Sequence, residues 1–135
     1  MEEKMKAVFD ESVVGVLATV KEDGSPWSSP LHLVLGDGFV HWFSTEDKVH
    51  SLNIARDPRV SLVHFSRDTS GGPKGVYING KAELLDAEGR QETYQLFEKR
   101  LGSVPSTFDK ASAYRLPIGQ FDEHKSTGNC WYFYS

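Results

Sequence analysis

Hydroxyl side chains at the start of a helix can help to bind a phosphate group, and this sequence places two of them at Ser44 and Thr45. They follow the aromatic, β-rich run Phe39–Phe43 and precede a helical pattern. Backbone N–H groups at a helix N-terminus carry partial positive charge and attract anions. The same residues also fit ordinary helix capping, because Asp47 lies three residues after Ser44. From local features alone, capping is the commoner explanation.

Basic residues follow these hydroxyls at the positions where a phosphate would need counter-charge. Lys48 and His50 lie in the first turns of the predicted helix. Glu46 and Asp47 lie beside them and would repel a phosphate unless their carboxylates point away. Asn53, three residues after His50, would share its face of the helix and orient the ring or a loop carbonyl.

The surrounding pattern predicts a strand, a short helix and a second strand. The helix is expected from about residue 45 to residue 56. It should end there because Pro58 disfavours a helical backbone conformation at Asp57. Extended structure is expected again over residues 60–65. Val49, Leu52 and Ala55 are expected to share one side of this helix.

The preceding third of the chain predicts an N-terminal helix and an antiparallel meander. Residues 2–11 have apolar residues at helical spacing. Residues 13–20 are almost continuously apolar, which is typical of a strand covered on both faces. Asp23-Gly24 predicts a tight turn into a strand over residues 25–35, and the glycines at 36 and 38 predict a second turn.

After a polar, glycine-rich loop over residues 66–75, residues 76–84 alternate as a strand does, with Gly80 marking a bulge or a close approach. Asp86 is positioned to cap a helix that extends to about residue 100. The expected buried side of that helix consists of Tyr94, Phe97 and Leu101.

Residues 103–110 are expected to form a loop with a helical turn, and the last two strands are expected over residues 113–121 and 130–134. No repeat or interdomain linker interrupts the pattern. The whole sequence therefore predicts one domain, residues 1–135, built as a small β-barrel with helices at its corners.

Composition excludes several classes of function. A formal charge of −4 and a pI near 5.7 do not suit a nucleic-acid-binding protein. No apolar run approaches the roughly 20 residues needed to cross a bilayer. A single cysteine, Cys130, and an N-terminus without an apolar signal region predict a cytoplasmic location. Cys130 is expected to be a small buried hydrophobe.

Common catalytic motifs are absent from the sequence. It has no glycine-rich dinucleotide motif, phosphate loop or nucleophile elbow. The histidines have no metal-ligand spacing, so no metal is expected. His32, His41 and His64 are expected to be structural or surface residues, and no residue stands out as a general acid or base.

An ordered set of short motifs nevertheless resembles the pyridoxamine 5'-phosphate oxidase-like, FMN-binding split β-barrel superfamily. The resemblance covers about residues 8 to 90, and its sharpest part is Asn53 together with the run Asp57–Val60. The other motifs are Gly15–Val20, Asp23–Pro26, Ser29-Pro30, Phe43–Thr45, His50 and Ser61-Leu62.

The resemblance implies a mainly β, six- to seven-stranded antiparallel split β-barrel that forms a homodimer, with FMN bound at the subunit interface. It implies that one strand runs along the isoalloxazine ring and that the next strand end meets the ribityl chain and the phosphate. The residues at the first set of positions are Ser28, Ser29, Pro30 and Leu31. Those at the second set are Phe43, Ser44 and Thr45, with Asn53 in the helix that follows.

Two departures from the family pattern bear on function. The family usually has lysine where His50 stands, although Lys48 is close enough to replace it. The basic residues that true pyridoxamine-phosphate oxidases carry on the second strand are missing from residues 28–33, and so is their C-terminal arginine and histidine motif. Vitamin B6 oxidation is therefore not predicted.

The resemblance implies an FMN-dependent oxidoreductase that acts on a small molecule not identified by the sequence. Trp27 and Trp131 are candidates for stacking on a flavin or for closing over it from the partner subunit, with core and dimer packing as the alternative. Trp42 is expected in the core. The alternatives are the same barrel with a deazaflavin cofactor or haem, or a flavin-binding module without catalysis. A haem ligand could not be assigned to His124 or to another residue.

Overall fold

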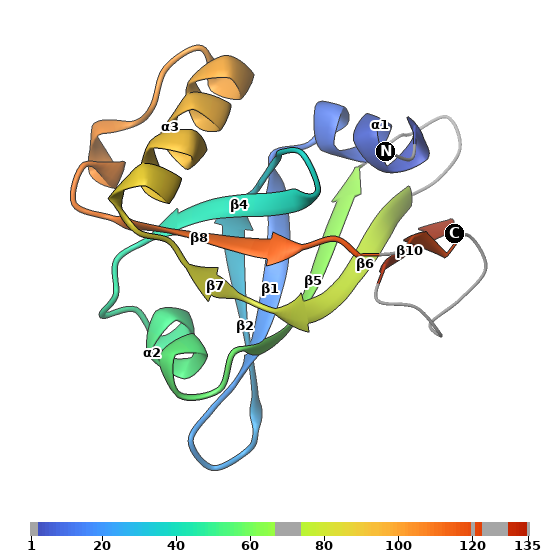
Figure 1. Cartoon of the computed structure of the whole chain (residues 1–135). Helices are drawn as coiled ribbons and strands as arrows, with labels where there is room; N and C mark the ends of the chain where they lie inside the picture. The colour runs from blue at the N-terminus through green and yellow to red at the C-terminus, as the bar shows by residue number, and fades with distance from the viewer. Residues whose placement is uncertain (1–2, 67–73, 120, 123–129, 135) are drawn as a thin grey trace.

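Two β-sheets whose strands cross each other form the body of the molecule in the computed structural model (Figure 1). The structure describes residues 3–66, 74–119, 121–122 and 130–134. The strands are β1 (Val14–Val20), β2 (Pro26–His32), β3 (Val34–Leu35), β4 (Phe39–Ser44), β5 (Arg59–Ser66), β6 (Lys74–Lys81), β7 (Glu83–Leu84), β8 (Ser112–Pro117), β9 (Phe121–Asp122) and β10 (Cys130–Tyr134). The helices are α1 (Glu3–Glu11), α2 (Val49–Arg56) and α3 (Ala87–Leu101), with a 3₁₀ turn η1 (Ser106–Phe108).

The six-stranded sheet has the order β2-β1-β5-β6-β10-β9, and the four-stranded sheet has the order β3-β4-β8-β7. All pairs are antiparallel except β9 with β10. The mainly β fold with flanking helices is therefore confirmed. The seven predicted strands appear as ten shorter segments in the described part of the chain.

The predicted strand over residues 25–35 is wrong as one element, because it divides between the sheets. β2 pairs with β1, whereas β3 pairs with β4. The chain changes sheet at Leu33, whose N–H donates to Val13 and whose side chain is 1% exposed. Burial of this leucine in the core holds the corner between the sheets.

A second predicted strand, residues 76–84, also divides, here at Ala82, whose N–H donates to the carbonyl of Pro58. The expected close approach at Gly80 is confirmed, since a Cβ there would lie 3.1 Å from Leu116 Cδ1. Beyond the division, Leu84 on β7 is 53% exposed.

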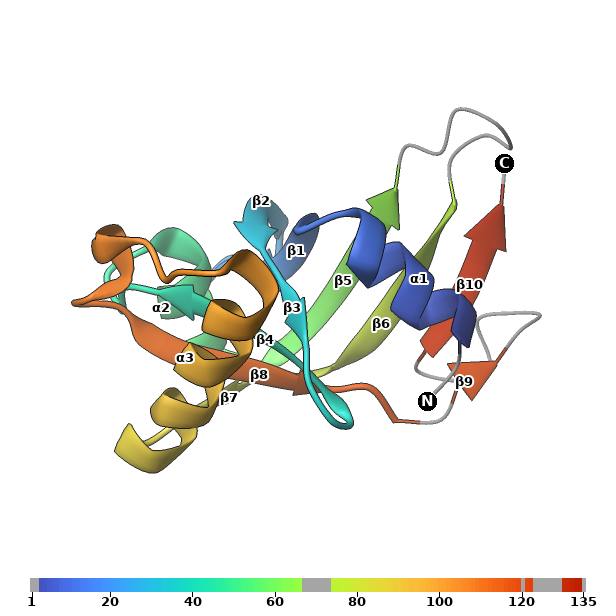
Figure 2. The ribbon, with the colours of Figure 1, turned by 90° about the horizontal axis from the view of Figure 1, so that it is seen from above.

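The main core lies between the two sheets and beneath α1, which packs on β5 and β6 (Figure 2). Its large, fully buried members include Met5, Leu17, Trp42, Leu62, Ile78 and Leu116. β1 buries one face, but its other face is half-buried, so the expected cover on both faces is incomplete.

A second core lies between the four-stranded sheet and α3 and is centred on Phe43 and Phe97. Asp86 caps α3 as predicted, accepting a hydrogen bond from Gly89 N at 2.9 Å. Phe97 is fully buried, whereas Tyr94 and Leu101 are only half-buried and Thr93 takes the remaining buried position. No helix in the described residues is long and apolar enough to span a bilayer.

Candidate functional site

The helix that follows β4 begins later than the sequence predicted. α2 starts at Val49 with Lys48 as its N-cap residue, and no side chain within the described chain caps it. The expected capping box of Ser44 with Asp47 is therefore wrong. Ser44 belongs to β4, and the Asp47 carboxylate accepts a hydrogen bond from Thr45, which lowers the pKa of Asp47. The first turn of α2 keeps N–H groups free to meet an anion.

Ser44 instead belongs to a buried cluster of polar side chains between β4, α2 and β8. Its Oγ lies 2.6 Å from His50 Nε2 and accepts a hydrogen bond from Ser51 Oγ at 3.0 Å. Ser51 also hydrogen-bonds the hydroxyl of Tyr114. Burial, with the nearby charge of Lys48, lowers the pKa of His50 below its ordinary value of 6.5. His50 is therefore neutral at pH 7 and does not supply the expected counter-charge.

The apolar side of α2 faces outward, although the apolar side of a surface helix is usually the buried one. Val49 and Leu52 are 43% and 53% exposed, and Ala55 is exposed as well. The buried residues are His50, Ser51, Asn53 and Ile54. A polar face can be buried here because β1, β4 and β8 supply hydrogen-bond partners, which removes most of the cost of desolvating those groups.

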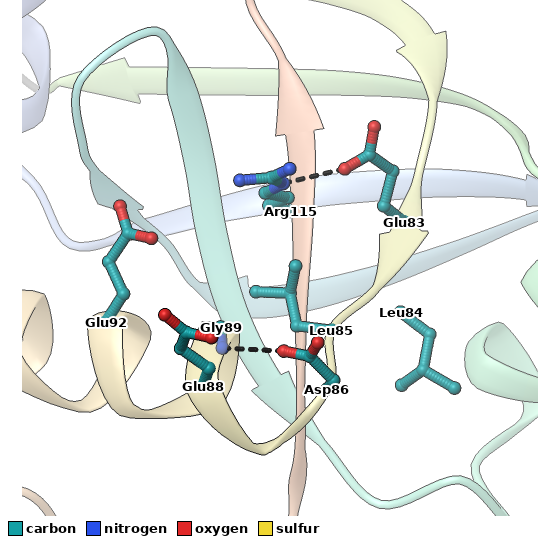
Figure 3. A pocket seen from close by; sticks show the side chains of 8 residues that line it. All are labelled: Glu83, Leu84, Leu85, Asp86, Glu88, Gly89, Glu92 and Arg115. Atoms are coloured by element: carbon teal, nitrogen blue, oxygen red, sulfur yellow. Dashed lines mark hydrogen bonds and ion pairs between the residues drawn. The ribbon is translucent and has the colours of Figure 1, made fainter.

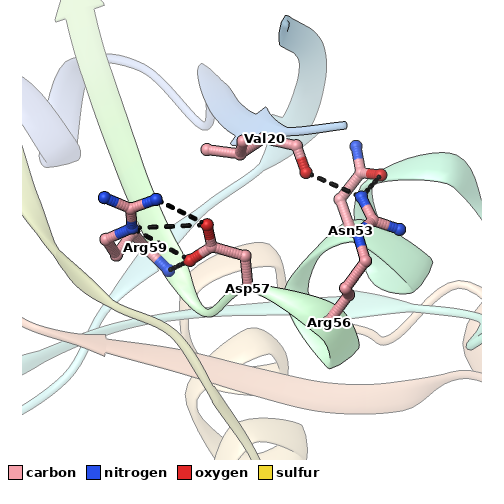
Figure 4. A network of polar contacts seen from close by, with 5 residues as sticks. All are labelled: Val20, Asn53, Arg56, Asp57 and Arg59. Atoms are coloured by element: carbon pink, nitrogen blue, oxygen red, sulfur yellow. Dashed lines mark hydrogen bonds and ion pairs between the residues drawn. The ribbon is translucent and has the colours of Figure 1, made fainter. Parts of the chain in front are cut away.

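Asn53 fastens α2 to the end of β1. Its Nδ2 donates to Thr19 Oγ1 at 3.0 Å, and its Oδ1 accepts from Arg56 Nη2 at 3.0 Å (Figure 4). Arg56 also donates to the carbonyl of Val20 at 2.9 Å. The prediction that Asn53 orients the His50 ring or a loop carbonyl is wrong, since its two polar atoms bind the side chains of Thr19 and Arg56.

Asp57 and Arg59 form a surface ion pair directly after α2. Their closest atoms lie 2.7 Å apart, and 71% of the Arg59 side chain is exposed (Figure 4). Hydrogen bonds from Arg59 lower the pKa of Asp57 to about 2. The pair holds the turn between α2 and β5 and does not face a cavity identified among the described residues.

The four residues predicted to lie along the flavin ring occupy β2, the edge strand of its sheet. Ser28 and Pro30 are exposed, and Leu31 is half-buried against the core. Ser29 is buried, and its Oγ accepts a hydrogen bond from Trp27 Nε1 at 3.1 Å. This edge offers backbone groups to a ligand or to another chain.

An apolar cavity of about 290 Å³ lies beside this edge strand. Three of the predicted site residues line it, namely Pro30, Leu31 and Phe43. The other lining residues are Val14, His32 and Phe108. Phe108 stacks on Phe43 with ring centroids 5.3 Å apart.

Sequence reasoning missed these last three residues as members of a site. Phe108 lies in η1, far along the chain from β2 and β4. His32 was expected to be structural or at the surface, and it is exposed at the cavity. No local pattern connects the three residues, because they meet only in the folded chain, where η1, the turn after α3, packs against β4.

β4 joins the cavity to the first turn of α2. Phe43 lines the cavity, and the next residue, Ser44, contacts His50. Thr45 is half-buried at the turn, and Lys48 is exposed at the start of the helix. The cavity and the uncapped helix N-terminus therefore lie at two consecutive residues of β4, and no residue of the helix start lines the cavity.

Trp131 does not join this region within one chain. Its backbone lies in β10, and β1, β5 and β6 separate β10 from β2. The side chain of Trp131, the loop over residues 67–73, His124 and the turn over residues 126–129 lie outside what the structure describes.

A second concavity, of about 360 Å³, lies between α3 and β7–β8 and has a different character (Figure 3). It contains one cation, Arg115, which pairs with Glu83 at 2.7 Å. Its other acidic residues are Asp86, Glu88 and Glu92. Such a lining repels an anionic ligand, so this concavity does not suit a phosphate. Within the described residues, no group of acidic, histidine or cysteine side chains could hold a metal ion.

Comparison with known proteins identifies the family. The family model described as pyridoxamine 5'-phosphate oxidase matches residues 1–122. The chain belongs to this family. A search among curated proteins found no match.

Solved structures share the fold of this family member. A conserved hypothetical protein from Mycobacterium tuberculosis is 23% identical with a TM-score of 0.75, over 99% of this chain and 85% of that one. A FAD-binding protein from Mesorhizobium loti is 22% identical with a TM-score of 0.69, over 89% and 91%. The haem storage protein HutZ from Vibrio cholerae is 20% identical with a TM-score of 0.72, over 88% and 90%. At these identities the likeness establishes the fold alone.

Proposed function

We propose that this chain binds FMN between β2, β4 and α2 and acts as a flavin-dependent oxidoreductase on a small molecule. The observation that carries the proposal is the apolar cavity at Pro30, Leu31 and Phe43, the last of which belongs to the strand that leads to the uncapped first turn of α2. A flavin nucleotide has an apolar ring system at one end and a phosphate at the other. The fold neighbour that binds FAD supports a flavin as the ligand class.

The phosphate end of the proposed site relies on backbone N–H groups and Lys48. The N–H groups of a first helical turn favour an anion by their orientation and partial charge. The Glu46 carboxylate accepts a hydrogen bond from Ser112 at 2.8 Å, and that of Asp47 accepts one from Thr45. These bonds give both carboxylates partners within the protein and restrain them beside the proposed phosphate position.

The proposed active unit is a homodimer. Cavities that enclose a whole cofactor-sized ligand usually measure about 300–1,000 Å³. The cavity of about 290 Å³ lies at the lower end of this range, and we propose that a second chain completes the walls around the ring. The exposed apolar face of α2 and the free edge of β2 provide surface for such a partner.

When bound, FMN would supply the hydride or electron transfer, and the residues of the chain would bind and orient it. Pro30, Leu31 and Phe43 would keep water from one part of the ring. Lys48 and the first turn of α2 would hold the phosphate and thereby fix the position of the ring within the cavity.

The absorption spectrum of the purified protein and a titration with FMN and riboflavin test this proposal. We expect a flavin spectrum or quenching of FMN fluorescence in the micromolar range. The double variant Lys48→Ala/His50→Ala should weaken FMN much more than riboflavin, because only FMN carries the phosphate. Lys81→Ala, an exposed lysine on β6, is the matched control and should leave both affinities unchanged.

Other outcomes would overturn parts of the proposal. A colourless protein that does not quench FMN fluorescence would exclude FMN binding. A deazaflavin spectrum would show that the cofactor is a deazaflavin and not FMN. Equal losses of FMN and riboflavin in the double variant would place the phosphate elsewhere. Bound FMN that does not turn over with NADH, NADPH or small oxidised acceptors would indicate a flavin-binding module.

Haem is the second candidate ligand, favoured by one observation. His32 is an exposed histidine in a cavity otherwise lined by apolar and aromatic side chains, an environment that suits an axially ligated haem. A fold neighbour is a haem storage protein. A Soret band on addition of haem, lost in His32→Ala and unaffected by FMN, would favour this ligand over a flavin.

A further inference from the structure

Phe108 forms one wall of the apolar cavity, although it lies in a turn at the surface. The turn is η1, within residues 102–110, which connect α3 to β8 (Figure 1). None of these residues is fully buried, and Phe108 itself is half-buried. A turn with so little buried surface has few contacts of its own that fix its backbone. The position of this wall therefore depends on the contacts that the turn makes with neighbouring elements.

Arg90 on α3 donates hydrogen bonds to the backbone of this turn. Its Nη2 donates to the carbonyl of Phe108 at 2.9 Å and to that of Asp109 at 3.4 Å. Its Nε donates to the carbonyl of Ala111, where β8 is about to begin, at 2.8 Å. An arginine suits this role because its planar guanidinium carries several N–H donors in a fixed fork. One side chain thereby ties three carbonyls of the turn to α3.

The same guanidinium contacts the other aromatic wall of the cavity. Its central carbon lies 5.1 Å from the centroid of the Phe43 ring, which is the geometry of a cation–π contact. The Phe108 ring stacks on Phe43 and meets Phe97 edge-on, with ring centroids 5.7 Å apart in the second pair. Arg90 therefore contacts both aromatic walls, Phe43 through its ring and Phe108 through its backbone.

His32 lies next to the wall that Arg90 holds. The rings of His32 and Phe108 meet edge-on, with centroids 6.4 Å apart and an interplanar angle of 75°. His32 is exposed and is the polar side chain of the cavity lining. A displacement of Phe108 would therefore change the width of the cavity and the surroundings of the His32 ring together.

We infer that Arg90 is a positioning residue for the cavity, because it fixes η1 so that Phe108 presents a rigid, flat wall to the ring system of the bound ligand. This inference rests on the proposed function, in which that ring system is the flavin. It adds to the site a residue of α3 that does not itself line the cavity. A fixed aromatic wall favours a planar ring over a flexible apolar chain, since a rigid ring loses little conformational entropy when it stacks.

A second arginine of α3 provides the matched control for a purely structural role. Arg100 donates to the backbone carbonyls of Phe9 and Asp10 at 3.4 Å and 2.9 Å, as Arg90 does to those of the turn. Neither of these partners lines the cavity. Arg100→Met and Arg90→Met each remove an arginine that binds backbone carbonyls, but only Arg90→Met should change the cavity.

NMR of the His32 ring signals tests the positioning in the ligand-free protein. An aromatic ring shifts the signals of protons near it, so a displaced Phe108 changes the signals of His32. We expect Arg90→Met to move them in the same direction as Phe108→Ala does, and Arg100→Met to leave them unchanged. Arg90→Lys keeps the charge without the planar fork, should move them as well, and replaces Arg90→Met if that variant does not fold. Wild-type His32 signals in the Arg90 variants would overturn the inference.

A double-mutant cycle with riboflavin tests the effect on the ligand, since riboflavin carries the ring system without the phosphate. Phe108→Ala should raise the dissociation constant of riboflavin by roughly fivefold, and Arg90→Met should raise it by a similar factor. In the Phe108→Ala background, Arg90→Met should change it by less than about twofold, because Arg90 acts through Phe108. An unchanged affinity in Arg90→Met, or the same loss in both backgrounds, would overturn the inference.

These outcomes distinguish failure of this inference from failure of the proposed function. If riboflavin binds and the effects of Arg90→Met and Phe108→Ala add, the inference fails and the proposed function stands. If no flavin binds but Arg90→Met moves the His32 signals, the flavin proposal fails and the positioning role stands, and haemin then replaces riboflavin in the cycle. A cavity that binds neither riboflavin nor haemin would overturn the inference as well.

Discussion

Two histidines, His41 and His64, are buried so completely that their titration should control stability in mild acid. His41 Nδ1 lies 2.8 Å from Thr93 Oγ1, and His64 Nε2 lies 2.6 Å from the carbonyl of Ser12. His64 also stacks on Phe9, with ring centroids 4.0 Å apart. Burial is the main cause that lowers the pKa of each histidine to about 4. Both rings are therefore neutral in the folded protein at pH 7.

We predict that the free energy of unfolding falls as the pH is lowered from 6.5 toward 4. In that interval the unfolded chain binds protons that the folded chain excludes, so protonation favours unfolding. Each histidine should contribute about 1.4 kcal/mol per pH unit. Stability from this source is complete above pH 6.5 and is lost as the pH falls toward the folded-state pKa.

Urea unfolding at several pH values between 4.5 and 6.5 measures this slope. His64→Gln should reduce the slope whatever its effect on absolute stability, and Lys81→Ala should leave it unchanged. A wild-type slope of zero across the interval would show that the two rings are not buried as neutral groups.

At the scale of single elements, α2 is held to the barrel by hydrogen bonds on its polar face. Asn53→Ala removes the bond to Thr19 and leaves that buried hydroxyl without its partner. We predict a loss of about 2 kcal/mol in the free energy of unfolding. Arg59→Gln removes a surface ion pair three residues beyond α2 and should change it by less than about 0.5 kcal/mol. Chemical denaturation of both variants makes the comparison, and equal losses would contradict the assigned role of Asn53.

The exposed apolar face of α2 leads to a prediction about assembly. If this face packs on a partner chain, Leu52→Lys should raise the dissociation constant of the dimer by roughly tenfold or more. Leu84→Lys is a matched control, because both leucines are 53% exposed but Leu84 lies on β7. Sedimentation equilibrium of the two variants measures the effect. A higher dissociation constant in Leu84→Lys alone would indicate that the interface lies at β7.

At the scale of the whole molecule, the proposed cofactor and the proposed dimer should stabilise each other. A ligand that contacts both chains binds the dimer more tightly than the monomer, and by linkage it shifts assembly toward the dimer. We predict that FMN at about 100 times its dissociation constant raises the free energy of unfolding by about 2.7 kcal/mol. This corresponds to a rise in Tm of roughly 5–15 °C.

Thermal denaturation over a range of protein concentrations measures this coupling. The Tm without FMN should depend on protein concentration, and FMN should raise it more than riboflavin does. A Tm that rises with FMN but is independent of protein concentration would indicate that the cofactor site is complete within one chain.

The sequence alone determined most of the elements, because their signals are local. Asp86 caps α3 where it was expected to, and Gly24 adopts the positive φ of 88° that its turn requires. The alternating and helical patterns defined the mainly β architecture. The sequence also indicated Pro30, Leu31 and Phe43 as neighbours, through their resemblance to a family, and the three line one cavity.

Only the tertiary structure decided which face of α2 is buried. Helical periodicity shows that Val49, Leu52 and Ala55 share one face, and hydrophobicity alone would place that face inside. The opposite face is buried because Thr19, Ser44 and Tyr114 come from three separate strands and offer hydrogen bonds to it. The cost of burying polar groups depends on partners far away in the sequence, and no local pattern contains them.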